Sequence, residues 1–129
     1  MEFNGHISHV LVIDDDEFLL LGVKKRLESA GYKVTTCDNV HDAYFKLNIL
    51  KPDLILLDII MPDINGLEFM TIIRSQYETL DVPIILMSYL DKNELLKMGY
   101  ELGSSEYFQK PFNLHTLPSK LQRFQLAVK

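Results

Sequence analysis

Five side chains that could do chemistry follow short apolar runs at four places in the chain. Asp14 and Asp15 follow HVLVI, Asp58 follows LILL, Ser88 follows PIILM, and Lys110 follows YFQ. Apolar runs of this length predict buried strands. In open α/β sheets the carboxyl ends of parallel strands meet at one edge, where ligands bind. We therefore expect three carboxylates, a hydroxyl and an ammonium group in one crevice.

This set of groups suits phosphoryl transfer. Three carboxylates repel one another unless a cation lies among them, and Mg²⁺, with Mn²⁺ as the alternative, binds carboxylates while sharing its remaining positions with water and phosphate. Asp58 can then attack phosphorus as a nucleophile and form an aspartyl phosphate. Lys110 can neutralise charge on the transferring group, and Ser88 can donate a hydrogen bond to a phosphoryl oxygen.

The elements that must position these residues alternate between strands and helices. Strands are expected at about 9–13, 33–37, 54–57, 83–87 and 107–109, and helices at about 18–30, 39–48, 66–76, 91–102 and 116–128. Gly31 and Gly103 stand where a left-handed residue would end the first and fourth helices. Pro118 fits only a first helical turn, so the last helix begins at Thr116 or Leu117 or is kinked. The alternation predicts a single three-layer α/β domain with a parallel sheet.

Helical spacing of apolar residues predicts the inward faces of three helices. These faces comprise Phe18, Leu19, Val23 and Leu27 in the first helix, Val40, Ala43, Tyr44 and Leu47 in the second, and Leu114, Leu117, Leu121, Phe124 and Val128 in the last. Asp91, with Glu94 three residues later, predicts a capping box. Asp16 is expected as a helix cap or as a further acid beside the site.

Composition and charge narrow the classes of function. The chain has 129 residues, enough for one domain with its own core, and its one cysteine, Cys37, excludes an internal disulfide and indicates a buried or half-buried thiol in a reducing compartment. No apolar stretch approaches the roughly 20 residues that span a bilayer, and the amino terminus lacks a signal pattern, so we expect a cytoplasmic protein. The net charge of −5, with no basic run longer than KKR, argues against direct binding of nucleic acid.

Four segments of the chain resemble the receiver domain of two-component response regulators. They are VIDDDE, LILLDIIMPDINGLEF, PIILMS and EYFQKPF, and they follow the family's order over nearly the whole chain. The resemblance implies a flavodoxin-like fold of five βα units with a five-stranded parallel sheet of order 2-1-3-4-5. It implies a single receiver domain over residues 1–129, with a core of about 8–127. Such a domain either stands alone or precedes a C-terminal output domain in a longer chain.

The resemblance also gives each matching residue a role. Asp58 matches the phosphoacceptor, and Asp14 and Asp15 match the acidic pair that holds the metal ion with Asp58. Ile60 matches the position whose backbone carbonyl is a further metal ligand. Ser88 and Tyr107 match the switch hydroxyl and the switch aromatic, and Lys110 matches the lysine that precedes a cis peptide bond to Pro111.

The function implied by the resemblance is a phosphorylation-dependent signalling switch. Its phosphodonor is a histidine kinase or a histidine phosphotransfer protein, and it catalyses only its own aspartyl phosphorylation and dephosphorylation. Its output is a changed affinity for a downstream domain or protein. The face made by the fourth helix, fifth strand and fifth helix transmits the signal and is a possible homodimer contact; here it holds Leu95, Met98, Tyr107, Phe108 and Leu121.

Two alternatives remain beside the switch. An aspartyl-phosphate phosphatase would need a general acid or base near Asp58, and Ile60 stands where such hydrolases often have an acid. An unphosphorylated pseudo-receiver would act only as an interaction module, and the complete set of three acids, a serine and a lysine argues against it.

Several residues depart from the family pattern. Tyr89 stands where a small residue is frequent and would narrow access to the site, so small phosphodonors are expected to work poorly. Ile60 and Leu90 are apolar at positions that flank the hydrolytic water, which predicts slow loss of the phosphoryl group. Met98 and Tyr100 replace small residues near the end of the fourth helix and indicate an altered output face.

Overall fold

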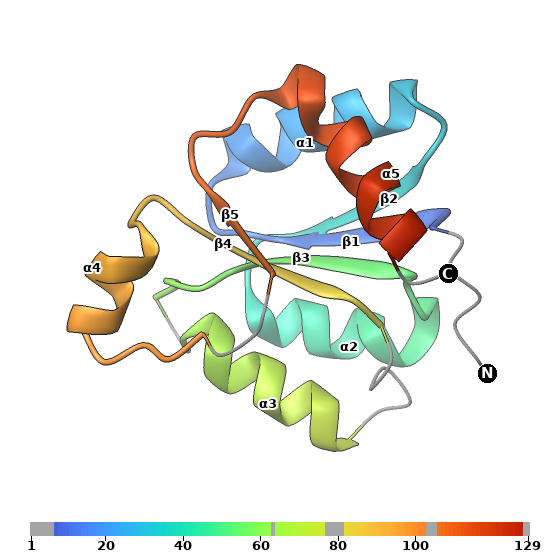
Figure 1. The fold of residues 1–129 in the computed structure, drawn as a ribbon. Helices are drawn as coiled ribbons and strands as arrows, with labels where there is room; N and C mark the ends of the chain where they lie inside the picture. Colours follow the sequence, from blue (N-terminus) through green and yellow to red (C-terminus); the bar gives the residue numbers. More distant parts are fainter. Residues whose placement is uncertain (1–6, 63, 77–81, 103–105, 128–129) are drawn as a thin grey trace.

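The computed structural model describes residues 7–62, 64–76, 82–102 and 106–127. Five parallel strands form its middle layer (Figure 1). The strands are β1 (His9–Ile13), β2 (Lys33–Cys37), β3 (Leu54–Asp58), β4 (Ile84–Ser88) and β5 (Glu106–Gln109). Their order in the sheet is β2-β1-β3-β4-β5, and every neighbouring pair is parallel. The predicted α/β fold and its strand order are confirmed.

Helices cover both faces of this sheet (Figure 1). They are α1 (Glu17–Ser29), α2 (Val40–Leu50), α3 (Gly66–Gln76), α4 (Lys92–Lys97) and α5 (Leu117–Ala127), the last preceded by a 3₁₀ turn at Leu114–Thr116. Buried residues of α1 and α5 share one apolar core, whereas those of α2, α3 and α4 share the other. The central strand β3 serves both cores, since Leu54 and Leu56 face the first, and Ile55 and Leu57 face the second. This explains its continuous apolar sequence.

Helix α1 begins and ends as its sequence predicts. The side chain of Asp16 accepts hydrogen bonds from the N–H groups of Phe18 and Leu19 and caps the amino terminus. At the other end Gly31 has a φ of 97°, and its N–H donates to the carbonyl of Glu28. Glycine adopts this left-handed conformation without steric cost. Gly31 therefore turns the chain from α1 into β2.

Helix α4 is shorter than predicted. Its capping box between Asp91 and Glu94 is present, but Gly99, with a φ of 91°, ends the helix rather than Gly103, which lies outside the described residues. The N–H groups of Gly99 and Tyr100 donate to the carbonyls of Leu96 and Leu95, a paired arrangement that closes a helix at a left-handed glycine. The prediction of a helix through Leu102 was wrong, because the left-handed glycine that ends the helix is Gly99, four residues before Gly103.

Two inward positions were also predicted wrongly. Phe18 is 89% exposed, and Leu20 is buried in its place. Two residues along a helix correspond to a rotation of about 200°, so a face centred on Leu20, Val23 and Leu27 turns Phe18 to the opposite side. Tyr44 is 37% exposed at the edge of α2, and its hydroxyl donates to Gln76 Oε1 of α3.

The remaining expectations concern the last helix and the cysteine. Pro118 lies in the first turn of α5, which begins at Leu117 without a kink being needed, and Leu117 and Leu121 are fully buried. Val128 and the side chain of Phe124 lie outside the described part of the chain. Cys37 is buried as predicted, and burial raises the pKa of its thiol to about 11. Within the described residues, the helices are too short or too polar to cross a bilayer.

Candidate functional site

Asp58 is the last residue of β3 and is only 3% exposed. The N–H of Ile60 donates to its Oδ1 atom at 3.3 Å. The start of α3 presses against the same strand end, because the N–H of Gly66 donates to the carbonyl of Ile59 at 2.6 Å. A Cβ at Gly66 would lie 2.3 Å from the backbone oxygen of Asp58, closer than atoms can approach. Only glycine lets the helix begin this near the carboxylate.

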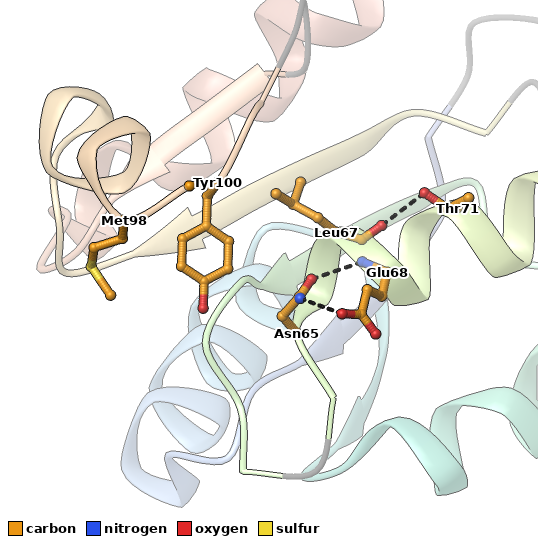
Figure 2. Close-up of a pocket in the computed structure, with 7 residues that line it drawn as sticks. Asn65, Leu67, Glu68, Thr71, Met98 and Tyr100 are labelled. Atoms are coloured by element: carbon orange, nitrogen blue, oxygen red, sulfur yellow. Dashed lines mark hydrogen bonds between the residues drawn. The ribbon is translucent and has the colours of Figure 1, made fainter.

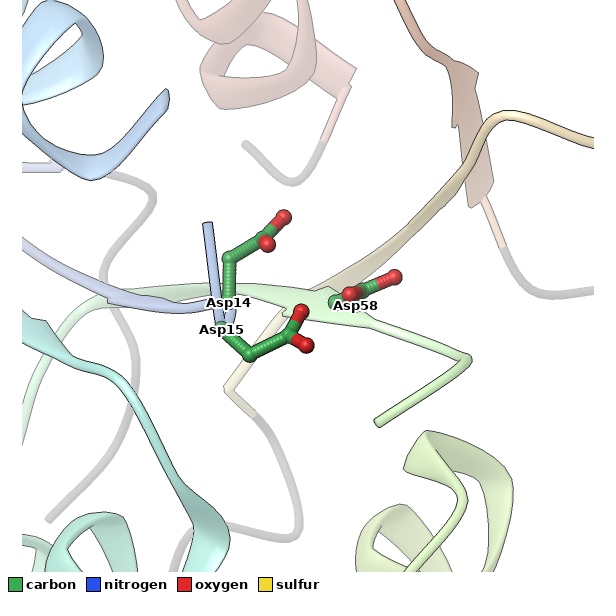
Figure 3. Close-up of side chains that lie close together, drawn as sticks. All are labelled: Asp14, Asp15 and Asp58. Carbon is green, nitrogen blue, oxygen red and sulfur yellow. The ribbon is translucent and has the colours of Figure 1, made fainter. Parts of the chain in front are cut away.

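The carboxylates of Asp14 and Asp15 come from the end of β1 and lie beside Asp58 (Figure 3). Each of the three acids offers an oxygen within 4.8 Å of the others. Asp14 is fully buried and Asp15 is exposed, so the cluster has a solvent side. The N–H of Asp16 donates to Asp14 Oδ1 at 2.9 Å and fixes that carboxylate. Such a set of hard oxygen donors suits a divalent cation.

Lys110 supplies the positive charge from the end of β5. Its Nζ atom lies 2.8 Å from Asp14 Oδ2 and 3.6 Å from Asp58 Oδ1, and the side chain is 4% exposed. Burial alone lowers the pKa of Lys110, but the hydrogen bond to Asp14 and the charge of Asp58 raise it above its ordinary value. The peptide bond to Pro111 is cis, as expected, and the N–H of Lys110 donates to the carbonyl of Ser88 at 2.7 Å. Lys110 is therefore a fixed ammonium ion between two buried acids.

The electrostatics of the cluster are unbalanced without a metal ion. Burial, and next the charge of Asp14, raise the pKa of Asp58 from 3.8 to about 7, although Lys110 acts in the opposite direction. One ammonium group thus does not compensate for three neighbouring carboxylates. A divalent cation among them would remove that repulsion, so the residues present fit the Mg²⁺ that the sequence predicts.

Ser88 and Tyr107 lie on the two strands next to β3 on one side. The register pairs Asp58 with Met87, which places Ser88 one residue beyond on β4. Its side chain is 2% exposed, and its Oγ accepts from the N–H of Leu90 at 3.1 Å. The hydroxyl of Tyr107 donates toward the carbonyl of Ser88 at 3.0 Å and also contacts that of Leu90. Tyr107 thereby ties β5 to the segment that follows β4.

The sequence did not predict two contacts around the mouth of the site, that of Tyr89 with Lys110 and the close approach of Gly66 to β3. The ring of Tyr89 is 57% exposed, and its centroid lies 4.8 Å from the Nζ of Lys110, within cation–π distance. Ile60 is 40% exposed and Leu90 is half-buried. The bulk of Tyr89 was noted from the sequence, but its contact with Lys110 depends on the fold. The Asn65-Gly66 pair indicated a turn, but it did not predict how closely Gly66 approaches the backbone of Asp58.

A separate hollow of about 420 Å³ lies between the start of α3 and the end of α4 (Figure 2). It is lined by Asn65, Leu67, Glu68, Thr71, Met98, Gly99 and Tyr100. The side chains of Asn65 and Glu68 are engaged with one another at 2.8 Å, and the hydroxyl of Thr71 donates to the carbonyl of Leu67. None of the acids of the cluster lines this hollow.

Residues 10–122 match the family model of the response regulator receiver domain. The chain belongs to this receiver family. Among curated relatives, the transcriptional regulatory protein CrdR of Helicobacter pylori is 35% identical over 115 residues, and the transcriptional regulatory protein KdpE of Staphylococcus aureus is 36% identical over 122 residues. These alignments cover 89% and 95% of this chain but only 54% and 52% of the two relatives. The receiver thus spans about half the length of both.

Solved structures agree with this assignment. The chemotaxis response regulator CheY4 of Vibrio cholerae superimposes with a TM-score of 0.80 at 31% identity, over 92% of this chain and 98% of that one. A two-component response regulator from Clostridium difficile gives a TM-score of 0.82 at 28% identity, over 95% and 98% of the two chains. The receiver is accordingly a signalling module of a two-component system rather than a conventional enzyme. Such a system implies a histidine kinase as partner.

Proposed function

We propose that this receiver accepts a phosphoryl group on Asp58 from a phosphohistidine of a histidine kinase or a histidine phosphotransfer protein. The observation that carries the proposal is the placement of the Asp58 carboxylate, buried at a strand end between two acids and the ammonium group of Lys110. An oxygen of Asp58 attacks phosphorus, the P–N bond breaks, and its electron pair returns to the imidazole nitrogen of the donor. A P–O bond forms, leaving an aspartyl phosphate.

The divalent ion would be Mg²⁺ or Mn²⁺. Asp14, Asp15 and Asp58 would hold it through carboxylate oxygens, together with the backbone carbonyl of Ile60. When bound, the ion neutralises negative charge on the phosphoryl oxygens. The two acids of β1 have different surroundings. Asp14 is buried, and the N–H of Asp16 fixes its carboxylate, whereas Asp15 is exposed and leaves the metal position open to solvent.

Lys110 and Ser88 would complete the first contacts of the phosphoryl group. Lys110 Nζ already lies near Asp58, so it can donate to a phosphoryl oxygen without a large movement. The Oγ of Ser88 accepts a hydrogen bond from Leu90 and keeps its own hydrogen to donate. The hydroxyl of Tyr107 donates to the backbone carbonyl of Ser88. Movement of Ser88 toward the phosphate would disturb this hydrogen bond and so transmit phosphorylation of Asp58 to β5.

The output would be a change of affinity for a downstream domain or protein at the face of α4, β5 and α5. Of the residues expected there, Leu95 and Leu121 are fully buried and cannot contact a partner directly. Tyr107 and Phe108 are half-buried. Met98 is 58% exposed and Leu96 is 63% exposed, so these two give the face its apolar contact area. The relatives' names describe transcriptional regulatory proteins, and we propose a regulatory output of that general kind for the protein that contains this receiver.

The aspartyl phosphate should be lost slowly. Ile60 and Leu90 lie at the mouth of the site, and neither side chain can orient water or accept a proton. Replacing Ile60 with asparagine would supply a polar group at that place. We expect the variant to lose its phosphoryl group faster than the unchanged receiver, measured by intact-protein mass spectrometry after removal of the donor. A half-life of seconds in the unchanged receiver would refute slow loss.

Phosphoramidate tests the proposal because it carries the same P–N bond as phosphohistidine. The receiver, incubated with phosphoramidate and Mg²⁺, should gain the mass of one phosphoryl group, slowly because the ring of Tyr89 narrows access to the site, and chelation of the metal should prevent the gain. Asp58→Asn should abolish the gain. Asp16→Asn is the matched control, since asparagine also caps a helix and Asp16 is not in the metal cluster. Metal-dependent phosphorylation that persists in Asp58→Asn would contradict the proposal.

A further inference from the structure

The ammonium group of Lys110 has more donors than its two acidic neighbours use. Its Nζ atom donates to Asp14 Oδ2 at 2.8 Å and forms a longer ion pair of 3.6 Å with Asp58 Oδ1. An ammonium group carries three N–H donors and is strongly hydrated in water. The side chain of Lys110 is nevertheless only 4% exposed. A further group of the protein therefore takes the place of water around it.

The ring of Tyr89 is that group. Lys110 Nζ lies over the ring, 4.8 Å from its centroid, and the negative face of an aromatic ring attracts a cation within roughly 6 Å. Tyr89 itself is 57% exposed, so its ring stands between the ammonium group and the solvent. A ring face has no charge of its own. It can therefore cover Lys110 without competing with the two carboxylates for the ammonium group.

Strand β5 fixes the position of Tyr89 as well as that of Lys110. The side chain of Gln109 donates to the carbonyl of Tyr89 at 3.3 Å. The carbonyl of the preceding residue, Ser88, accepts from the N–H of Lys110 at 2.7 Å and from the hydroxyl of Tyr107 at 3.0 Å. The backbone around Tyr89 is thus bonded to the segment that carries Lys110. The fold itself places the ring over the ammonium group.

We propose that Tyr89 is a positioning residue for Lys110, a role that rests on the proposed function of Asp58 as the phosphoacceptor. The ring keeps the ammonium group beside Asp58, where it can donate to a phosphoryl oxygen. A lysine side chain that is already ordered loses less conformational entropy when the phosphoryl group arrives, so the phosphorylated state is more stable. This role differs from obstruction of the mouth of the site. Obstruction slows entry and exit alike and leaves the equilibrium unchanged, whereas positioning changes the equilibrium.

Equilibrium binding of beryllofluoride separates these two roles. In the presence of Mg²⁺ this anion binds a carboxylate oxygen as a stand-in for the phosphoryl group, and ¹⁹F NMR measures the bound fraction. Tyr89→Leu keeps an apolar side chain but removes the ring, and it should weaken binding by about threefold to tenfold. Tyr89→Phe keeps the ring and should bind as the unchanged receiver does. Phe45→Leu is the matched control, since Phe45 is a 58% exposed ring on α2, outside the site; it should leave the affinity unchanged.

The same titration with Lys110 replaced by methionine tests whether the ring acts through the lysine. Lys110→Met should itself weaken binding, and adding Tyr89→Leu should weaken it no further, as expected when one residue acts through another. A second measurement needs no ligand. The ring current of an aromatic face above Lys110 should shift the Cε protons of the lysine upfield in the unchanged receiver and in Tyr89→Phe, but not in Tyr89→Leu. Circular dichroism confirms the folding of each variant.

The outcomes distinguish the role of Tyr89 from that of Asp58. Equal affinities of Tyr89→Leu and the unchanged receiver would overturn the positioning role and leave the proposed function standing. An equal loss in the presence and absence of Lys110, or Cε protons of Lys110 at their ordinary chemical shift in the unchanged receiver, would also overturn it. An unchanged receiver that binds no beryllofluoride with Mg²⁺ would refute the proposed function, and the role of Tyr89 with it.

Discussion

Neutralising Asp58 should stabilise the metal-free receiver. Asp58 is 3% exposed, lies among two other acids, and its pKa is raised from 3.8 to about 7 by burial and by Asp14. A carboxyl group whose pKa is higher in the folded protein than in the unfolded chain costs stability when it is ionised. The cost is absent below the unfolded pKa, grows as the pH rises from about 4 to 7, and is complete above about 7. Asp58→Asn keeps the shape of the side chain and removes this cost.

The size of the effect follows from the difference between the two pKa values. Each unit corresponds to about 1.4 kcal/mol, so the difference of about three gives roughly 4 kcal/mol as an upper value. The same substitution also removes the attraction between the Asp58 carboxylate and the ammonium group of Lys110, which offsets part of this gain. We therefore expect Asp58→Asn to raise the free energy of unfolding at pH 8 by about 2–4 kcal/mol, and by close to zero at pH 4.

Urea unfolding followed by circular dichroism measures this difference. The receiver and Asp58→Asn are compared in EDTA at pH 8, 6 and 4, with Asp16→Asn as the control that should change little. Adding Mg²⁺ should stabilise the unchanged receiver more than the variant, because the ion binds the folded acids. Equal stability of Asp58→Asn and the unchanged receiver at pH 8 without metal would show that the three acids do not strain the fold as we argue.

Three further changes test particular contacts. Gly66→Ala should destabilise the receiver by roughly 1–3 kcal/mol in urea unfolding, because its Cβ would overlap the backbone of Asp58; a neutral result would contradict the close approach. Gly99→Ala should cost about 1–2 kcal/mol, since φ is 91° there, and no loss would mean that α4 does not end at Gly99. Tyr89→Ala should speed phosphorylation by phosphoramidate, measured by mass spectrometry, and an unchanged rate would show that the ring does not narrow access.

The strands and the acidic cluster could be predicted because their sequence signals are local and strong. Strands β1, β3 and β4 are buried throughout and read as apolar runs that stop at a polar residue, as β3 stops at Asp58. Once parallel strands are assumed, their carboxyl ends must share one edge. The structure accordingly brings Asp14, Asp15 and Lys110 to Asp58. Their chemical roles remain predictions.

Other features depend on contacts between distant parts of the chain. Periodicity did not decide between Gly99 and Gly103 as the end of α4; the packing of Tyr100 against the core that contains Leu95 favours the first. The exposure of Phe18 reflects which face of α1 meets the sheet, and several apolar residues in that helix allowed more than one face. The contact of Tyr89 with Lys110 joins two loops that are far apart in sequence.

The central claim is that Asp58 carries the phosphoryl group, and chemical mapping of the phosphorylated receiver tests it most directly. Borohydride reduces an acyl phosphate of aspartate to homoserine, which tandem mass spectrometry then places in a peptide. After phosphorylation with phosphoramidate and Mg²⁺, we predict homoserine at position 58 and unmodified aspartate at Asp14 and Asp15. Homoserine at either of those acids, with Asp58 unmodified, would contradict the account.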